Sequence, residues 1–425
     1  MNVISEYLKS VPIPEMIRVR QRFPRACIDN LPEAVDHQIG RPEIRATIRK
    51  GDNIAIAVGS RGIANLPVIV RQIVQKIKHF GAEPFIVPAM GSHGGATAGG
   101  QERILETLGI TEQAVGAPVR SSMDVVLVGK TDGGLPVYLD RYASEADGMV
   151  VINRVKPHVG FRGDHECGLV KMIAVGLGKH KGAEACHGSG FGRMAGNIVD
   201  AARMATSNRN VCFGVAILEN AYNETCKVAF LTPDEIFTAE PDLLREARTL
   251  SPKLPFQQLD VLIIDEIGKN IAGTGLDTNV VGRYHTPYAS GGPEISKIVV
   301  LNLTDESHGN ANGIGIADFT SRRLHEKINF EQTYLNSLTS TVQNSIKIPM
   351  VLNNDRLAVS AAIQTCNVAD NKDVRMVRIR NTKSLESIYV SGALLGEVAG
   401  KTDLMTVDGS LLPLAFGPDG NLPGL

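Results

Sequence analysis

Several kinds of residue are scarce or missing in this chain of 425 residues, and each absence narrows the class of protein. There is no tryptophan, and the net charge is -1 at pH 7, because 44 lysines and arginines face 45 aspartates and glutamates. A total this close to zero favours no basic surface for nucleic acid or for an anionic membrane. No apolar run approaches the roughly 20 residues of a membrane-spanning helix. We therefore expect no nucleic-acid partner and no membrane partner.

The cysteines and the N-terminal residues predict a cytoplasmic protein. The six cysteines are scattered and form no CxxC pair, which is typical of reduced thiols rather than of a disulfide framework. The first residues, MNVISEYLKSVPIPEM, lack the basic segment followed by an apolar segment that marks a secretory signal.

Several well-known catalytic motifs are also missing. The chain has no GxGxxG after a predicted strand, no GxxxxGK[ST], no HExxH, no GxSxG and no EF-hand loop. These absences count against a soluble dinucleotide, ATP hydrolysis, zinc proteolysis and serine hydrolysis.

The alternation of strand-like and helix-like patterns predicts an α/β fold with mainly parallel sheets. Residues 53–58 form an apolar run, residues 66–77 carry apolar side chains at helical spacing, and residues 84–87 form a second apolar run. The length exceeds that of a usual single core, and the stretch 250–258 has two prolines and little periodicity.

We therefore predict two α/β domains with the active site in the cleft between them. Residues 1–255 would form the catalytic and cofactor-tethering domain, and residues 256–400 the substrate-capping domain. Residues 401–425 would form a tail that packs back on the N-terminal domain.

Three candidate functional residues follow predicted strands. Arg61 comes after the strand at 53–58, His93 after that at 84–87, and His158 after a third at 149–155. The carboxyl ends of parallel strands meet at one sheet edge, where such folds bind ligands. A guanidinium can hold a carboxylate, and an imidazole can exchange a proton near neutral pH. The alternatives are a structural ion pair for Arg61 and a turn histidine for His93.

The segment 168–192 supplies a lysine and a histidine sixteen positions apart. Lys171 lies among apolar neighbours, whereas Lys179 and Lys181 lie in a polar stretch broken by glycine. An apolar setting lowers a lysine's pKa and makes the amine a nucleophile, so we predict that Lys171 is the buried lysine. The alternative is a lysine that extends from a core segment to solvent. His187 could bind a metal, and Gly188 and Gly190 precede a predicted helix where a phosphate could bind.

A local zinc site at residues 156–168 has weaker support. His158 and His165 lie near Asp164, Glu166 and Cys167, but their spacing fits no known zinc pattern.

Together these motifs resemble the lactate racemase family that depends on a nickel-pincer nucleotide. The resemblance covers most of the first 260 residues and continues more loosely beyond. It rests on the order and spacing of five residues: Arg61 in SRGIANLP, His93 in GSHGG, His158 in KPH, Lys171 in CGLVK, and His187.

The resemblance implies a racemase or epimerase that moves a hydride reversibly at C2 of a 2-hydroxy acid. The cofactor would be nickel held by pyridinium-3,5-bisthiocarboxylic acid mononucleotide, attached at Lys171 with Gly188 and Gly190 beside it. His187 would be the nickel ligand, His93 and His158 the acid–base pair, and Arg61 the carboxylate-binding residue. Its partners would be the 2-hydroxy acid and cofactor biosynthesis proteins, with the chain a monomer or homodimer.

Departures from the family predict a substrate larger or more polar than lactate, such as a sugar acid. The loop between His158 and Lys171 is about three residues longer, and no tryptophan lines the substrate pocket. In place of the family's Tyr-Gln-x-x-Lys stretch stand other polar groups, of which Arg283 and His285 would contact the substrate.

Three other functions remain open. An oxidoreductase on this scaffold would need a second redox partner, for which the sequence has no dinucleotide motif. A nickel-cofactor carrier would need Lys171 and His187 but no acid–base pair. A sugar-acid-binding protein would contain no nickel.

Overall fold

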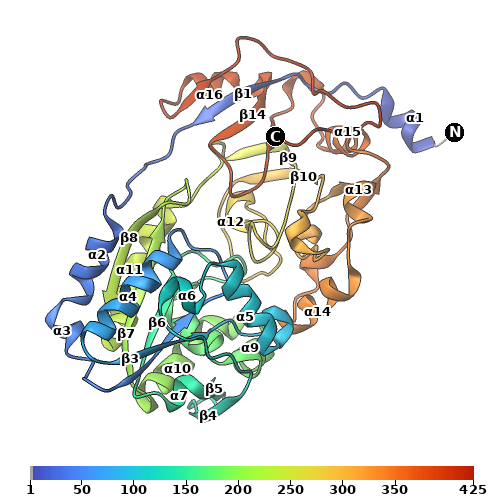
Figure 1. Ribbon diagram of the computed structural model, residues 1–425. Helices are drawn as coiled ribbons and strands as arrows, with labels where there is room; N and C mark the ends of the chain where they lie inside the picture. Colours follow the sequence, from blue (N-terminus) through green and yellow to red (C-terminus); the bar gives the residue numbers. More distant parts are fainter. Residues whose placement is uncertain (1–2) are drawn as a thin grey trace. The chain divides into compact units, whose positions relative to one another are not determined.

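The computed structural model describes residues 3–425 and divides them into two compact units. Unit 2 is Arg25–Ser251, and unit 1 combines residues 3–24 with Pro252–Leu425. Both units are α/β and contain a mainly parallel sheet (Figure 1), which confirms the predicted fold class. In the described residues, no helix has the length and apolar character needed to cross a membrane.

Unit 2 is built on a five-stranded sheet with the order β3-β2-β6-β7-β8. All neighbouring strands are parallel except β7 and β8, which form an antiparallel edge. The strands are β2 (Asn53–Val58), β3 (Glu83–Pro88), β6 (Gly148–Arg154), β7 (Val211–Glu219) and β8 (Thr225–Leu231).

Helices cover both faces of this sheet. On one face, α2 (Leu31–Ile39) and α4 (Leu66–His79) share a core with alternate side chains of β2, β6 and β7. The six apolar residues that predicted α4 are each at most 1% exposed, so its hydrophobic stripe is fully buried. On the other face, a Cβ at Gly214 of β7 would touch Leu169 and Ile236, so α8 (Leu169–Lys171) and α11 (Pro233–Leu250) pack there.

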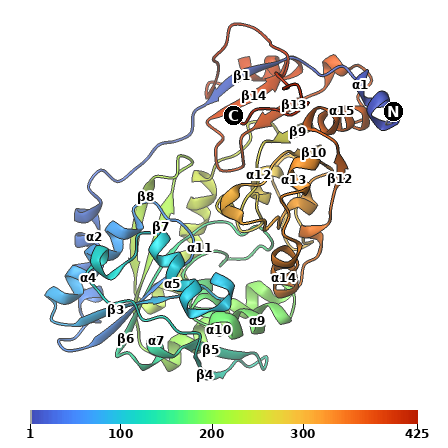
Figure 2. The ribbon, with the colours of Figure 1, turned by 45° about the vertical axis from the view of Figure 1, so that its right-hand side comes forward.

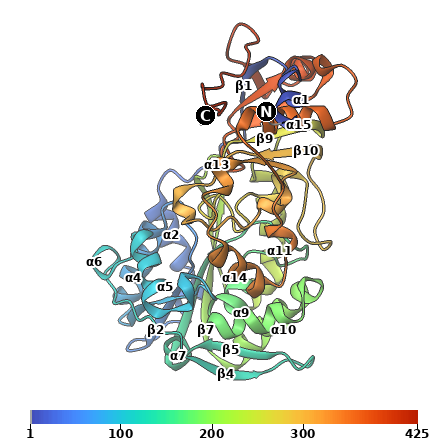
Figure 3. The same cartoon turned by 90° about the vertical axis from the view of Figure 1, so that its right-hand side faces the viewer.

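The remaining elements of unit 2 surround the predicted functional segments. They include α5 (Ala98–Thr107), the π-helix Met172–Gly176, α9 (Lys179–Gly188) and α10 (Phe191–Asn208). An antiparallel hairpin of β4 (Val125–Lys130) and β5 (Pro136–Asp140) contacts α9 and α10 (Figure 3). The helix predicted after Gly190 corresponds to α10.

Unit 1 contains an eight-stranded sheet with the order β12-β11-β10-β9-β13-β14-β1-β15. The first five strands are parallel and the last three pair antiparallel. The strands are β9 (Gln258–Ile264), β10 (Glu294–Val300), β11 (Phe319–Ser321), β12 (Met350–Leu352), β13 (Met376–Ile379), β14 (Ser387–Ser391), β1 (Met16–Gln21) and β15 (Leu404–Thr406). The principal helices are α1 (Val3–Lys9), α12 (Thr278–Val281), α14 (Phe330–Ser340), α15 (Asp355–Thr365) and α16 (Leu395–Ala399).

The division of the chain differs from the predicted one at both ends. Strand β1 lies between β14 and β15, so the first residues belong with the C-terminal part of the chain. The predicted tail at 401–425 also packs there rather than on residues 25–251, because β15 pairs with β1 and Leu412 bridges Met16. Figure 2 shows β1 beside β14. The physical reason is that β1 buries Met16, Ile17 and Val19 in unit 1.

Candidate active site

The segments that follow β2 and β3 meet at the carboxyl edge of the unit 2 sheet. These strands are parallel neighbours, and Ser60, two residues after β2, hydrogen-bonds through its hydroxyl to Nδ1 of His93. Arg61 is half-buried beside this contact, whereas the His93 side chain is exposed. The structure therefore brings Arg61 and His93 to the same edge, as the strand pattern predicts.

Arg61 lies among other charged and polarisable groups. Burial lowers the pKa of Arg61, Cys167 opposes this effect, and the positive charge of Arg154 adds to it. Arg154 pairs with Glu219, whose other carboxylate oxygen accepts the Ala64 N–H at 2.6 Å. The carboxylate of Glu219 thus fixes the turn that carries Arg61.

His158 is buried and held by its own loop. Its backbone N–H donates to Glu166 at 2.5 Å, and the Gly160 N–H donates to its Nδ1 at 3.0 Å. Because Nδ1 accepts this bond, a neutral His158 carries its proton on Nε2. The ring is therefore set to donate a proton from Nε2.

Lys171 ends α8 and continues directly into the π-helix Met172–Gly176. Burial lowers the pKa of Lys171, and Arg61 and Lys156 lower it further, while Cys167 and Cys186 oppose the shift. A lowered pKa favours the neutral, nucleophilic amine. Single π-turns within helices are frequent at functional sites.

His187 lies in the last turn of α9. Burial, with a smaller contribution from Lys171, lowers the pKa of His187 to about 4, so its ring is neutral at pH 7. Its Nδ1 is buried and has no hydrogen-bond partner among residues 3–425. A neutral imidazole with an uncompensated nitrogen has the properties of a metal ligand.

Two phenylalanines connect these groups, and no sequence motif pointed to either of them. The His158 ring lies 4.3 Å from Phe161 and 6.1 Å from Phe191, and the His187 ring lies 5.4 Å from Phe191. The Lys171 amine lies 5.8 Å from the centre of the Phe161 ring. His158, Lys171 and His187 therefore surround one aromatic pair, although Lys171 and His187 are far from His158 in sequence.

The fully buried lysine is Lys179 rather than Lys171, which corrects the prediction from the local pattern. Lys171 is half-buried, whereas the Lys179 side chain is 0% exposed. The Lys179 amine pairs with Asp140 at 3.1 Å, donates to Gln101 at 3.1 Å and donates to the Pro88 carbonyl. These partners are distant in sequence, so the residues around Lys179 do not reveal its burial.

This lysine supports the loop that carries His93. The Gln101 amide donates from Nε2 to the carbonyls of Gly91, at 2.9 Å, and His93, at 3.2 Å. Asp140, Lys179 and Gln101 thus form a buried network beneath the loop, as a structural lysine would.

Comparisons with known proteins give one match in sequence and one in structure. The model of the lactate racemase N-terminal domain matches residues 20–194, which include Arg61, His93, His158, Lys171 and His187. The lactate racemase apoprotein from Thermoanaerobacterium thermosaccharolyticum is similar in structure, with a TM-score of 0.50 and 14% sequence identity. The alignment covers 87% of this chain and 99% of that one. No curated protein matches the chain.

Residues 20–194 are similar in sequence to the lactate racemase N-terminal domain. The sequence match lies in the part of the chain that carries the five candidate residues, and the structural match extends the likeness to the fold.

Arg283 forms hydrogen bonds with other residues of unit 1. Its guanidinium donates to Asp318 at 2.7 Å and to the carbonyls of Ile316, Ile295 and Ser296. His285 is buried, and burial lowers its pKa to about 4. Arg283 therefore donates hydrogen bonds to four residues of the protein itself, whereas the sequence predicts that it contacts the substrate.

The predicted phosphate-binding glycines lie between two helices. Gly188 ends α9, and Gly190 precedes α10 with a φ of 77°, which favours glycine at this turn. A Cβ at either position would meet no atom within 4 Å, so the backbone there is open to approach.

The described residues contain no cluster of three or more His, Cys, Asp or Glu side chains that could hold a metal. The histidine of the loop at 156–168 that pairs with a carboxylate is His165, whose Nδ1 lies 3.1 Å from Glu240. A metal bound at His187 would need most of its ligands from a cofactor.

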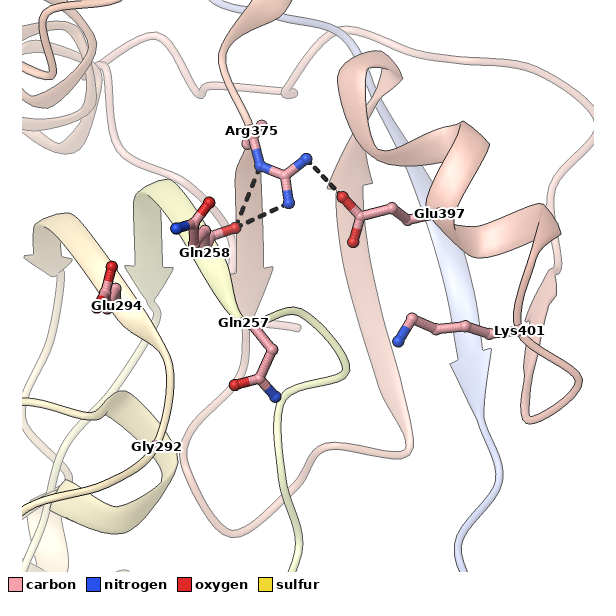
Figure 4. Close-up of a pocket in the computed structure, with 7 residues that line it drawn as sticks. All are labelled: Gln257, Gln258, Gly292, Glu294, Arg375, Glu397 and Lys401. Atoms are coloured by element: carbon pink, nitrogen blue, oxygen red, sulfur yellow. Dashed lines mark hydrogen bonds and ion pairs between the residues drawn. The ribbon is translucent and has the colours of Figure 1, made fainter.

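Unit 1 carries a hollow with a volume of about 390 Å³ (Figure 4). Arg375 crosses it, pairing with Glu397 at 2.6 Å and donating to the Gln258 carbonyl. Its lining is Gln257, Gln258, Gly292, Glu294, Arg375, Glu397 and Lys401. None of these residues belongs to the five-residue motif, so we do not place the chemistry here.

Proposed function

We propose that the chain is a racemase or epimerase that acts at C2 of a 2-hydroxy acid with a nickel-pincer nucleotide tethered to Lys171. Two observations carry the proposal. The amine of Lys171 has a lowered pKa and lowers the pKa of the neutral His187. The buried Nδ1 of His187 has no hydrogen-bond partner within residues 3–425. The lactate racemase N-terminal domain match over the same residues supports it.

The residues fit such a cofactor. Lys171 would supply the attachment point and His187 one nickel ligand, while Gly188 and Gly190 leave the backbone open beside them. Sulfur and imidazole donors in a planar arrangement suit Ni(II). When bound, the cofactor supplies a reversible hydride acceptor, which a side chain alone does not offer.

The residues of the chain would hold the substrate and move its hydroxyl proton. Arg61 binds the carboxylate through paired charged hydrogen bonds. One histidine takes the proton from the C2 hydroxyl as the hydride leaves C2, which yields the 2-keto acid. The keto acid then presents its other face, and the second histidine supports the reverse step, with His93 and His158 serving opposite faces.

We propose a substrate larger or more polar than lactate, such as a sugar acid. The support is that the chain has no tryptophan to fill the pocket, and that the loop between His158 and Lys171 is long. A screen of lactate and sugar acids in matched amounts tests this choice. Comparable turnover of lactate and gluconate-type acids, or turnover of lactate alone, would contradict it.

The first experiment measures the cofactor. The chain is produced in a host that makes the nickel-pincer nucleotide, and intact mass, peptide mapping and nickel content are measured. We expect a mass increment on Lys171 and about one nickel per chain. A K171R variant should carry neither, and an unmodified Lys171 in the wild-type chain would overturn the proposal.

The second experiment follows the hydrogen at C2. A substrate deuterated at C2 should racemise with its deuterium retained, because a hydride that leaves for a bound acceptor returns to the same carbon. Loss of deuterium to the solvent would instead indicate direct removal of a proton and would contradict hydride transfer.

A further inference from the structure

Two buried carboxylates beside the site have no part in the proposed chemistry. Glu166 and Glu240 are each 1% exposed. Burying a carboxylate costs several kcal/mol unless hydrogen bonds or charges compensate it. Most of the groups that compensate these two belong to the segments that carry His158 and Lys171, and Arg248 of α11 adds a charge beside Glu166.

Glu240 binds the start of the helix that carries Lys171. Its Oε2 accepts the N–H of Leu169 and that of Val170, the latter at 3.3 Å, and its Oε1 lies 3.1 Å from Nδ1 of His165. A Cβ at Gly168 would lie 2.5 Å from this carboxylate. Glycine at 168 therefore lets Glu240 approach the first free amides of α8, which are otherwise unsatisfied.

Glu166 binds the backbone of His158. Its Oε2 accepts the His158 N–H at 2.5 Å, and its Oε1 accepts Nη2 of Arg248 at 2.6 Å. Arg162 reaches the His158 carbonyl at 2.7 Å and lies 3.6 Å from Glu166. The backbone of His158 is thus held on both sides by charged groups.

Glu240 and Arg248 both belong to α11. They are eight positions apart, which corresponds to about 12 Å along a helix axis. The helix begins at a capping box formed by Thr232 and Glu235, and it ends at Leu250, directly before the chain leaves unit 2 at Ser251. One helix therefore contacts both the segment of the tethering lysine and the segment of a proton-transfer histidine.

We propose that α11 is the positioning helix of the site. Glu240 orients Lys171 through the amides of α8, and Arg248 orients His158 through Glu166. Both are positioning residues, since neither touches the reacting atoms. This inference rests on the proposed function, because it assigns the two contacts to cofactor attachment and to turnover.

The test compares E240Q with R248M and reads two quantities in each variant. The first is amide hydrogen exchange at Leu169, Val170 and His158 in the cofactor-free chain. The second is the fraction of Lys171 that becomes modified in the cofactor-producing host, followed by kcat and KM. R245M is the matched control, because Arg245 lies on the same helix and pairs with Asp242 where both side chains are exposed.

We expect E240Q to speed exchange at Leu169 and Val170 about 10-fold, the size of a lost charged hydrogen bond, and to lower the modified fraction. R248M should leave Lys171 modified but speed exchange at His158 and lower kcat about 10-fold with KM unchanged. R248K, which keeps a charged donor, should recover part of that loss, and R245M should match the wild type.

Wild-type exchange in both variants, or an unchanged kcat in R248M, would overturn the inference. If E240Q does not fold, R248M and R248K still decide, since Arg248 is 40% exposed and Glu166 keeps the His158 N–H and Arg162 as partners when Arg248 is replaced. An unmodified and inactive wild-type chain would instead refute the proposed function, while the exchange measurements would still test the two contacts.

Discussion

The two proposed acid–base histidines differ in the groups bound at Nδ1. His158 accepts a backbone N–H there, whereas His93 meets the Ser60 hydroxyl, which can donate or accept. His93 can therefore hold a proton on Nδ1, in which case Nε2 is the ring nitrogen whose lone pair can accept the substrate proton. At the residue scale, Ser60 decides which nitrogen of His93 is available.

Ser60→Ala should lower kcat about 5- to 10-fold and leave KM unchanged, because one hydrogen bond to His93 is lost while Arg61 remains. The check is steady-state kinetics of the loaded enzyme, with ¹⁵N NMR of the His93 tautomer as a second readout. Ser60→Thr keeps the hydroxyl and serves as the control. An S60A enzyme with wild-type kcat and tautomer would refute this role.

His285 gives unit 1 a pH dependence. Burial lowers its pKa from 6.5 to about 4, so between these values the unfolded chain binds a proton that the folded chain does not. Above pH 6.5 the buried His285 is neutral in both the folded and the unfolded chain and costs no stability. As the pH drops from 6.5 toward 4, the free energy of unfolding falls by about 3 kcal/mol because of this residue.

His285→Asn should therefore remove much of this acid loss, measured as the difference in unfolding free energy from wild type between pH 7 and pH 4. His308→Asn is the control, since His308 is exposed in the same unit and has a φ of 48° that asparagine tolerates. Parallel pH profiles for wild type and H285N would contradict the assignment.

Residue identity and order were enough to select the five candidate residues, but not their partners. Lys171 and Lys179 differ in the sequence mainly by their neighbours. The apolar neighbours of Lys171 favour its burial, whereas the completely buried lysine is Lys179. What buries Lys179 is Asp140, Gln101 and Pro88, all brought in by the fold. Pairings of this range are not encoded in local periodicity.

At the scale of elements, the segment after Lys171 packs directly on the His93 loop. The Gly91 N–H donates to the Gly176 carbonyl at 3.1 Å, and a Cβ at Gly176 would lie 2.8 Å from the Ala89 carbonyl oxygen. Since that oxygen belongs to the backbone, it cannot move aside at low cost. The π-helix and the loop therefore fit together only with glycine at 176.

Gly176→Ala should destabilise unit 2 by about 1–3 kcal/mol through overpacking. Gly196→Ala is the matched control, because Gly196 lies inside α10 and a Cβ there meets nothing within 4 Å. That change should be neutral or stabilising by up to about 1 kcal/mol. Urea unfolding measures both, and equal effects of the two substitutions would contradict the packing argument.

Elements with a strong apolar pattern were predicted close to their observed bounds, as at 53–58, where β2 lies. Helix α11 was not predicted, although it carries Glu240 and Arg248. Pro241 interrupts its pattern, and Glu240 is buried by contacts with α8 rather than by an apolar stripe. A polar residue whose partners lie about 70 positions away gives no periodic signal.

At the scale of the whole molecule, the chain order does not match the division into units. Residues 3–24 precede unit 2 but complete the sheet of unit 1, where β1 lies between β14 and β15. A short strand with mixed polar and apolar residues does not reveal which sheet it joins. The sequence therefore predicted two α/β domains but assigned the first residues and the tail to the wrong one.

This arrangement predicts that a chain lacking residues 1–24 loses unit 1 and keeps unit 2. Strand β1 buries Met16, Ile17 and Val19, each at most 7% exposed, and their burial contributes about 5–9 kcal/mol. That amount is comparable to the total stability of a typical domain. Unit 2 has its own core, built from residues between Leu31 and Phe230, and needs none of the deleted residues.

Calorimetry and amide exchange in the shortened chain measure the outcome. We expect one transition that matches unit 2 of the intact chain, and loss of protection in β9, β13 and β14. A chain that begins at Ser10 is the control, since it loses α1, in which Leu8 is the buried residue, but keeps β1. If β14 stays protected in the chain without β1, then β14 and β15 do not depend on β1. If unit 2 is lost as well, the two units fold as one.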